Sequence, residues 1–115
     1  MTEYRIIAVD FDGTLCTDCY PKIGIPNIYL IEMLKTLQEE GCCIILWTCR
    51  CAERLEEARI WCEQFGLIFD KINENADEII EKYGSDSRKI YADVYIDDKA
   101  CFPWEKAEKI QEEEK

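Results

Sequence analysis

Four short apolar runs recur along the chain, and they constrain its fold more than any other feature. They cover residues 6–9, 42–47, 67–69 and 94–96. Each run is too short for an isolated helix, so each is predicted to be a strand. Because the runs are apolar almost throughout rather than at every second position, they are typical of strands covered on both faces, as in a parallel sheet.

Helical spacing fills the intervals between these runs. Apolar residues recur there at steps of three or four, and glycine or proline marks most boundaries. The predicted helices run from Pro26 to Gly41, over 55–65, over 76–83 and from Pro103 to 110. Strand and helix thus alternate four times, which predicts an α/β fold, an open three-layer α/β/α sandwich with a Rossmann-like parallel sheet. The 115 residues are expected to form one domain, 1–115, with a frayed acidic tail at 111–115.

The balance of charge limits what the chain can bind and which groups can move protons. The formal net charge is −11, and the sequence contains no histidine. A surface this acidic repels nucleic acid backbones, so binding to a duplex is disfavoured. Without imidazole, proton transfer near neutral pH falls to carboxylates, lysine, tyrosine or cysteine.

Hydropathy and cysteine usage indicate a cytoplasmic protein. The longest apolar run, 42–47, is far shorter than the roughly 20 residues that cross a bilayer, so no membrane partner is expected. The eight cysteines lie mostly in apolar runs or at helical positions, where reduced thiols are expected. Cys16 with Cys19 and Cys49 with Cys51 could supply four zinc ligands, but their spacing fits no standard zinc module.

Polar residues follow three of the predicted strands. Asp10 and Asp12 come after the first strand, Thr48 after the second, and Asp97 with Asp98 after the last. The carboxyl ends of parallel strands share one edge of a sheet, which is where ligands bind in such folds. Four acids gathered there would repel one another unless a hard cation neutralised them, and oxygen ligands suit Mg²⁺.

This grouping predicts phosphoryl transfer. With a metal ion on a phosphate oxygen, a carboxylate can attack phosphorus and form an aspartyl-phosphate that water then hydrolyses. Thr48 and a lysine are the expected donors to the transferring group. The alternative for any single strand-end aspartate is to cap the following helix, which explains two pairs on separate strands poorly.

The same residues resemble the four motifs of the haloacid dehalogenase superfamily. The segment Asp-Phe-Asp-Gly-Thr-Leu at 10–15 follows an apolar strand, and then come Thr48, Lys89 and Tyr-Ile-Asp-Asp at 95–98. The order and spacing span most of the chain. The chain looks similar to small bacterial members that have a Leu-Trp-Thr-x-Arg second motif, and this similarity indicates no particular substrate.

The resemblance implies a role for each motif residue. Asp10 would be the nucleophile, and Asp12 the acid and base. Asp10, the backbone carbonyl of Asp12, Asp97 and Asp98 would hold Mg²⁺, with one of the last two acting through water. Thr48 and Lys89 would bind the phosphoryl group, beside the turn at Gly13.

Two basic positions keep alternatives open. Lys89 has Arg88 and Lys99 close by in the sequence, and an ordinary solvated lysine is its other interpretation. Arg50 either contacts a phosphate or carboxylate of the substrate or is an exposed arginine at the start of a helix.

The spacing of the motifs leaves no room for a cap domain. Only 35 residues separate Asp12 from Thr48 and 40 separate Thr48 from Lys89, and the predicted scaffold uses both intervals. Residues 15–25 are expected to form the small flap beside the nucleophile, bordering the substrate, or else a plain surface loop. A site without a cap takes a large substrate, is covered by another copy of the chain in a homo-oligomer, or stays open to water.

The expected activity is therefore a Mg²⁺-dependent phosphomonoester hydrolase acting on a small phosphorylated substrate of unknown identity. A receiver domain of two-component signalling uses similar groups, but it begins with adjacent acids and carries its phosphorylated aspartate on a later strand, the reverse of the order here. A catalytically weak protein that binds a phosphorylated partner is the third interpretation. It is disfavoured because every motif position is filled.

Overall fold

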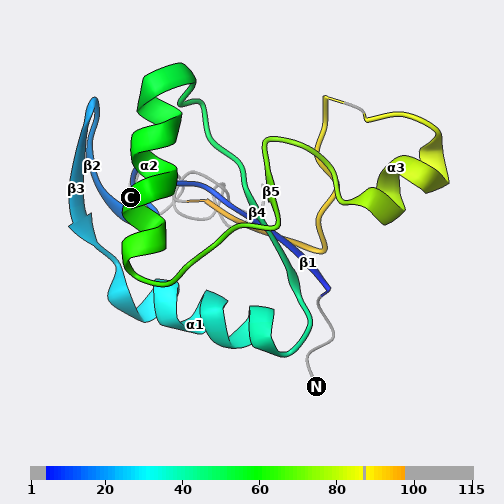
Figure 1. Cartoon of the computed structure of the whole chain (residues 1–115), viewed down its shortest axis with the longest axis horizontal. Helices are drawn as coiled ribbons and strands as arrows, with labels where there is room; N and C mark the ends of the chain where they lie inside the picture. The colour runs from blue at the N-terminus through cyan, green and yellow to red at the C-terminus, as the bar shows by residue number, and fades with distance from the viewer. Residues whose placement is uncertain (1–4, 87, 98–115) are drawn as a thin grey trace, which may run out of the picture.

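Strand β1 (Ile6–Val9) lies inside a four-stranded parallel sheet in the order β5–β4–β1–β6 (Figure 1). Its neighbours are β4 (Cys43–Leu46) and β6 (Val94–Ile96), and β5 (Lys71–Ile72) pairs with the outer side of β4. The computed structural model describes residues 5–86 and 88–97. The prediction of a mixed α/β fold with a parallel sheet is confirmed.

The continuous apolar character of β1 reflects burial on both of its faces. Ile7 and Val9 pack into a core with residues of two helices, whereas Ile6 and Ala8 pack into a second core on the other face. All four are at most 3% exposed. Successive side chains of a strand point to opposite faces, so only a strand covered on both sides needs apolar residues at every position.

Three helices are present in the described residues: α1 (Ile28–Glu39), α2 (Ala52–Gln64) and α3 (Asp77–Tyr83). The side chain of Asn27 caps α1 by accepting the amide of Leu30, which satisfies one of the amides left unpaired at a helix start. Helices α1 and α2 both contribute apolar side chains to the first core, together with β1 and β4. The three helices agree with the predicted ones within a few residues at each end.

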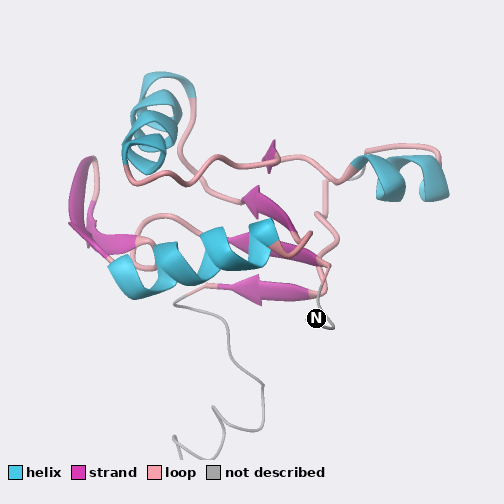
Figure 2. Ribbon diagram, turned by 60° about the horizontal axis from the view of Figure 1, so that its bottom comes forward, coloured by secondary structure: helices cyan, strands magenta, loops and turns pink. Residues whose placement is uncertain are grey.

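An antiparallel hairpin, β2 (Cys16–Cys19) and β3 (Lys22–Pro26), stands where the sequence predicted a flap-type loop at 15–25. Its sequence lacks a clean alternation of apolar and polar residues, because most of its side chains are at the surface. The hairpin and α2 lie at one end of the molecule, and α3 lies at the other (Figures 1 and 2). The hairpin also contacts the loop that follows β1, because the amide of Gly13 donates to the carbonyl of Cys16 at 2.9 Å.

The apolar run at 67–69 is not a strand, so this prediction is wrong. The parallel ladder beside β4 begins only at Lys71. One step earlier, the amide of Ile44 donates to the side chain of Asp70 at 2.7 Å instead of to a backbone carbonyl. The edge strand is thus shifted toward Lys71, whose polarity hid it from the sequence pattern.

Several predictions fall outside the described residues. These are the helix from Pro103 to 110, the tail at 111–115, and the residues Asp98 and Lys99. In the described part of the chain, no helix combines the length and apolarity that a membrane span requires.

Candidate functional site

The carboxyl ends of three neighbouring strands meet at one edge of the sheet. The amide of Asp10 donates to the carbonyl of Ile96 at 2.9 Å, and the amide of Trp47 donates to the carbonyl of Val9 at 2.9 Å. The first bond extends pairing one residue beyond β1, and the second extends it one residue beyond β4. Asp10, Thr48 and Asp97 are therefore brought to the same edge, as the sequence predicted.

Two adjoining cavities open at this edge. One, of about 310 Å³, lies toward the hairpin, and its lining residues are Asp10, Asp12, Asp18, Tyr20, Thr48, Cys49 and Arg50. The other, of about 290 Å³, lies toward β6, and its lining residues are Asp10, Trp47, Thr48, Cys49 and Asp97. Asp10, Thr48 and Cys49 border both cavities, so a group bound at Asp10 could extend into either.

The loop after β1 folds back through a tight turn. The carbonyl of Phe11 accepts the amides of Thr14 at 3.1 Å and Leu15 at 2.9 Å, and Gly13 has a φ of +83°. A side chain at that φ would be strained, so glycine suits the position. Phe11 points into the first core, and the next residue, Asp12, lines the cavity on the hairpin side.

Arg50 lies against Asp12 and is almost completely buried. Its Nε and Nη2 donate to the two carboxylate oxygens of Asp12, each at 2.8 Å. The Arg50 side chain is 1% exposed and that of Asp12 is 20% exposed. The hydrogen bond to Asp12 is the main reason that the pKa of Arg50 is raised. Of the two interpretations of Arg50, the exposed one does not describe this residue.

Thr48 is held from two directions. Its amide donates to Oδ1 of Asn73 at 2.8 Å, and its hydroxyl oxygen accepts the amide of Arg50 at 3.1 Å. Asn73 has a φ of +52°, a conformation that asparagine tolerates better than most residues. Sequence analysis missed Asn73, because an asparagine in a polar stretch indicates a turn but not what its side chain contacts.

The basic residues predicted for the third motif, Lys89 and Arg88, are not among the lining residues given above for these two cavities. Both residues are exposed. The structure therefore gathers Asp10, Asp12, Thr48, Arg50 and Asp97 around these two cavities.

Comparison with known proteins identifies a structural relative. A solved structure of a conserved protein from Bacteroides thetaiotaomicron matches with a TM-score of 0.74 and 39% sequence identity, covering 96% of this chain and 91% of the other. The chain belongs to the same family as this conserved Bacteroides protein. No protein-family model matches the sequence, and no curated protein matches it. The description of the Bacteroides protein names no activity.

The carboxylates in the cavity toward β6 suit a hard cation that takes only a few of its ligands from the protein. Asp10 and Asp97 line one cavity together. Within 5–86 and 88–97, no group of three or more histidine, cysteine, aspartate or glutamate side chains is gathered closely enough to hold a metal ion. This excludes a four-cysteine zinc site among those residues. Two carboxylates are what Mg²⁺ commonly takes from a protein, with water and phosphate oxygens completing its shell.

The cysteines are free thiols wherever the structure describes them, in agreement with the sequence prediction. Burial raises the pKa of the Cys62 thiol to about 12 and also raises that of Cys16. Such thiols stay protonated and behave as small apolar side chains. Cys49 differs because it is exposed at both cavities.

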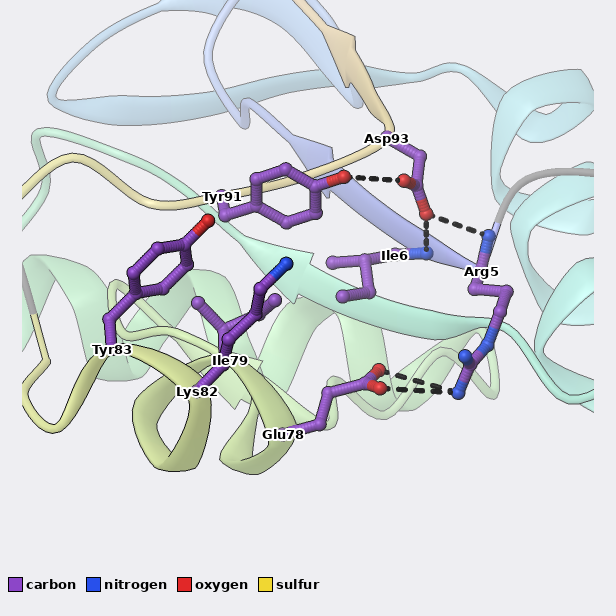
Figure 3. A pocket seen from close by; sticks show the side chains of 8 residues that line it. All are labelled: Arg5, Ile6, Glu78, Ile79, Lys82, Tyr83, Tyr91 and Asp93. Atoms are coloured by element: carbon purple, nitrogen blue, oxygen red, sulfur yellow. Dashed lines mark hydrogen bonds and ion pairs between the residues drawn. The ribbon is translucent and has the colours of Figure 1, made fainter.

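Another cavity, of about 230 Å³, lies near the start of β1 and is lined by α3 (Figure 3). Its charged groups largely pair with one another. Arg5 bonds Glu78 at 3.3 Å, and the hydroxyl of Tyr91 donates to Asp93 at 3.0 Å. The other oxygen of Asp93 accepts the amides of Arg5 and Ile6. This cavity opens at the edge of the sheet opposite Asp10, so it is separate from the candidate site.

Proposed function

We propose that this chain is a Mg²⁺-dependent phosphomonoester hydrolase of the haloacid dehalogenase type, with Asp10 as its nucleophile. The observation that supports this most is the position of Asp10, which borders two cavities at the end of a fully buried strand. Asp97 and Thr48 border the same space from the neighbouring strands. A rigid strand that ends in a carboxylate suits a nucleophile that must meet phosphorus in line.

The proposed reaction has two steps. A carboxylate oxygen of Asp10 attacks phosphorus, a new oxygen–phosphorus bond forms, and the bond to the leaving oxygen breaks. Asp12 enters this step protonated, gives its proton to that leaving oxygen and remains as a carboxylate paired with Arg50. Water then attacks the aspartyl-phosphate, Asp12 takes the proton of the water, and Asp10 is released with inorganic phosphate.

Several residues of the chain would bind the phosphoryl group or the metal ion. Mg²⁺ would be held by the carboxylates of Asp10 and Asp97 and by the carbonyl of Asp12, with Asp98 as a further candidate. When bound, the ion would offset negative charge on the phosphoryl oxygens. The hydroxyl of Thr48 would donate to a phosphoryl oxygen while it accepts the amide of Arg50. The lysine role is assigned by sequence order to Lys89, with Arg88 and Lys99 as alternatives.

The finer architecture belongs to the same proposal. Apolar cores on both faces of β1 support a three-layer α/β/α sandwich, and the short intervals between the motifs support a single domain without a cap. The hairpin β2–β3 would then be the part of the chain that borders the substrate at the cavity on its side. A small phosphorylated metabolite in the cytoplasm is the proposed substrate class.

The experiment is a phosphate-release assay on the purified chain with an aryl phosphate. Activity is expected with Mg²⁺ and should vanish with EDTA. Asp10→Asn should abolish it while the chain stays folded, because asparagine keeps the size of the side chain but is not a nucleophile. Glu40→Gln is the matched control, since Glu40 is exposed at the end of α1 and should retain full activity.

The assay also separates the rival functions. Equal turnover with and without a chelator would exclude this mechanism. A stable phosphorylated Asp10 without turnover, detected by intact-protein mass spectrometry after incubation with acetyl phosphate, would instead favour a signalling module. Binding of phosphate without phosphorylation or turnover would favour a phosphate-binding protein.

A further inference from the structure

The guanidinium of Arg50 joins three parts of the structure. Besides the two bonds to Asp12, its Nη2 donates to the carbonyl of Lys22 at 3.0 Å, and its Nη1 donates to the carbonyls of Pro21 at 3.3 Å and Arg54 at 3.5 Å. An arginine has five side-chain N–H groups, and here they have five acceptors. Arg50 therefore links Asp12, the tip of the hairpin and the first turn of α2.

Two aromatic rings lie close to the same group. The guanidinium carbon lies 5.0 Å from the ring centre of Phe11 and 5.1 Å from that of Tyr20, distances at which cations and rings attract each other. Phe11 is fully buried, and Tyr20 stands on the hairpin with 58% of its surface exposed. The hairpin thus contributes one ring and two carbonyls to the environment of Arg50.

We infer that Arg50 is a positioning residue that orients the carboxylate of Asp12. Through Arg50, the tip of the β2–β3 hairpin also influences this orientation. This inference rests on the proposed function. Arg50 lines the cavity on the hairpin side, yet its N–H groups are directed to protein acceptors, so its role differs from that of a substrate-binding arginine.

The coupling between hairpin and Asp12 follows from burial. If the hairpin tip moved away, Arg50 would lose two acceptors in a place that water hardly reaches, and buried unpaired donors are costly. The guanidinium would then shift toward other acceptors and take the Asp12 carboxylate with it. Lysine cannot replace this arrangement, because its single ammonium cannot bond both carboxylate oxygens in the plane of a fork.

The test compares two substrates whose leaving groups differ in their need for a proton. Glycerol phosphate releases a basic alkoxide that needs the proton of Asp12, whereas dinitrophenyl phosphate releases a stable anion that does not. In Arg50→Lys and Arg50→Met, kcat/KM for glycerol phosphate should fall by about 100-fold or more, within the range of lost general acid catalysis. For dinitrophenyl phosphate the loss should stay below about tenfold.

A second variant guards against a simple loss of folding. Tyr20→Ala removes the ring over Arg50 and leaves the ion pair intact. It should therefore reduce activity on glycerol phosphate more than on dinitrophenyl phosphate, as the Arg50 variants do, but by a smaller factor. Tyr29→Ala is its control, because Tyr29 is an exposed tyrosine on α1 and should leave both substrates unaffected. Hydrogen exchange of amides 16–26 should accelerate in the Arg50 variants, while that of α3 should not.

Each outcome decides between the alternatives. Equal losses on both substrates would make Arg50 a structural residue only and overturn the inference. A raised KM with unchanged kcat would make it a substrate-binding residue and overturn it as well. If the wild type hydrolyses neither substrate with Mg²⁺, the proposed function fails and the inference falls with it, and this result is distinct from the other two.

Discussion

The amide of Thr48 donates a 2.8 Å hydrogen bond to the side chain of Asn73, the residue immediately after β5. Thr48 itself stands at the end of β4 and borders both cavities. The position of the hydroxyl that faces the site is thus set by a turn 25 residues later in the chain. This contact predicts that Asn73 affects stability and activity together.

Asn73→Ala should destabilise the fold by about 2 kcal/mol, because alanine loses the bond to Thr48 and fits the positive φ poorly. Asn73→Gly restores the backbone freedom and should recover part of that loss. Unfolding in urea measures the difference. If alanine and glycine are equally stable, the strain at Asn73 is not a factor. Asn73→Asp keeps the acceptor and should remain closest to the wild type.

Asp10 and Asp97 should bind Mg²⁺ together, and this can be tested without any substrate. A ligand that binds only the folded state raises stability by RT ln(1 + [L]/Kd), so MgCl₂ should raise the melting temperature of the wild type. In Asp97→Asn the rise should largely disappear, while Glu40→Gln should keep it. A rise of equal size in Asp97→Asn would place the ion elsewhere.

Asp93 should make stability depend on pH in the acid range. Its pKa is lowered chiefly by the hydrogen bond from the amide of Ile6, with further bonds from Arg5 and Tyr91. Because the folded pKa is below the unfolded one, this contribution is complete above about pH 4 and is lost as the pH falls through the folded pKa. Asp93→Asn should therefore be less stable than the wild type at neutral pH, and the gap should close in acid. A gap independent of pH would contradict this explanation.

Gly24 is required for the two strands of the hairpin to approach each other. A Cβ at this position would lie 2.1 Å from Oγ1 of Thr17 and 2.3 Å from its backbone carbonyl oxygen. Gly24→Ala should cost about 1–3 kcal/mol, since the strands must move apart. Thr17→Ala, as a control, removes the hydrogen bond from Ile25 to the hydroxyl and the contact of the hydroxyl with the Cys19 thiol, and it should cost about 1 kcal/mol. Denaturant unfolding measures both, and a neutral Gly24→Ala would show that the hairpin shifts freely.

The sequence predicted the elements whose apolar residues follow a simple pattern, either continuous as in a buried strand or at helical spacing. Strand β1 agrees at both ends because all four of its residues are buried, and α1 agrees closely because Ile31 and Leu34 repeat on its buried side. Strand β5 was missed, since Lys71 and Ile72 are only partly buried at the edge of the sheet.

At the site, the sequence indicated which residue types gather at the strand ends but not how they are paired. Asp10, Thr48 and Asp97 could be predicted because parallel strands bring their carboxyl ends together. The pairing of Arg50 with Asp12 could not, because it depends on a turn and a hairpin that have no periodic pattern. The contact between Asn73 and Thr48 was hidden for the same reason.

Strand β1 is enclosed on its two faces and along both edges, and this has a consequence for how the molecule loses its shape on heating. Segments with such complete enclosure open only when the whole domain opens. The carboxylate at the end of β1 should therefore stay in place until the last stage of melting, whereas the outlying hairpin can loosen earlier. Gradual warming should first loosen the hairpin beside Asp10, and only then displace Asp10 from its position at the end of β1.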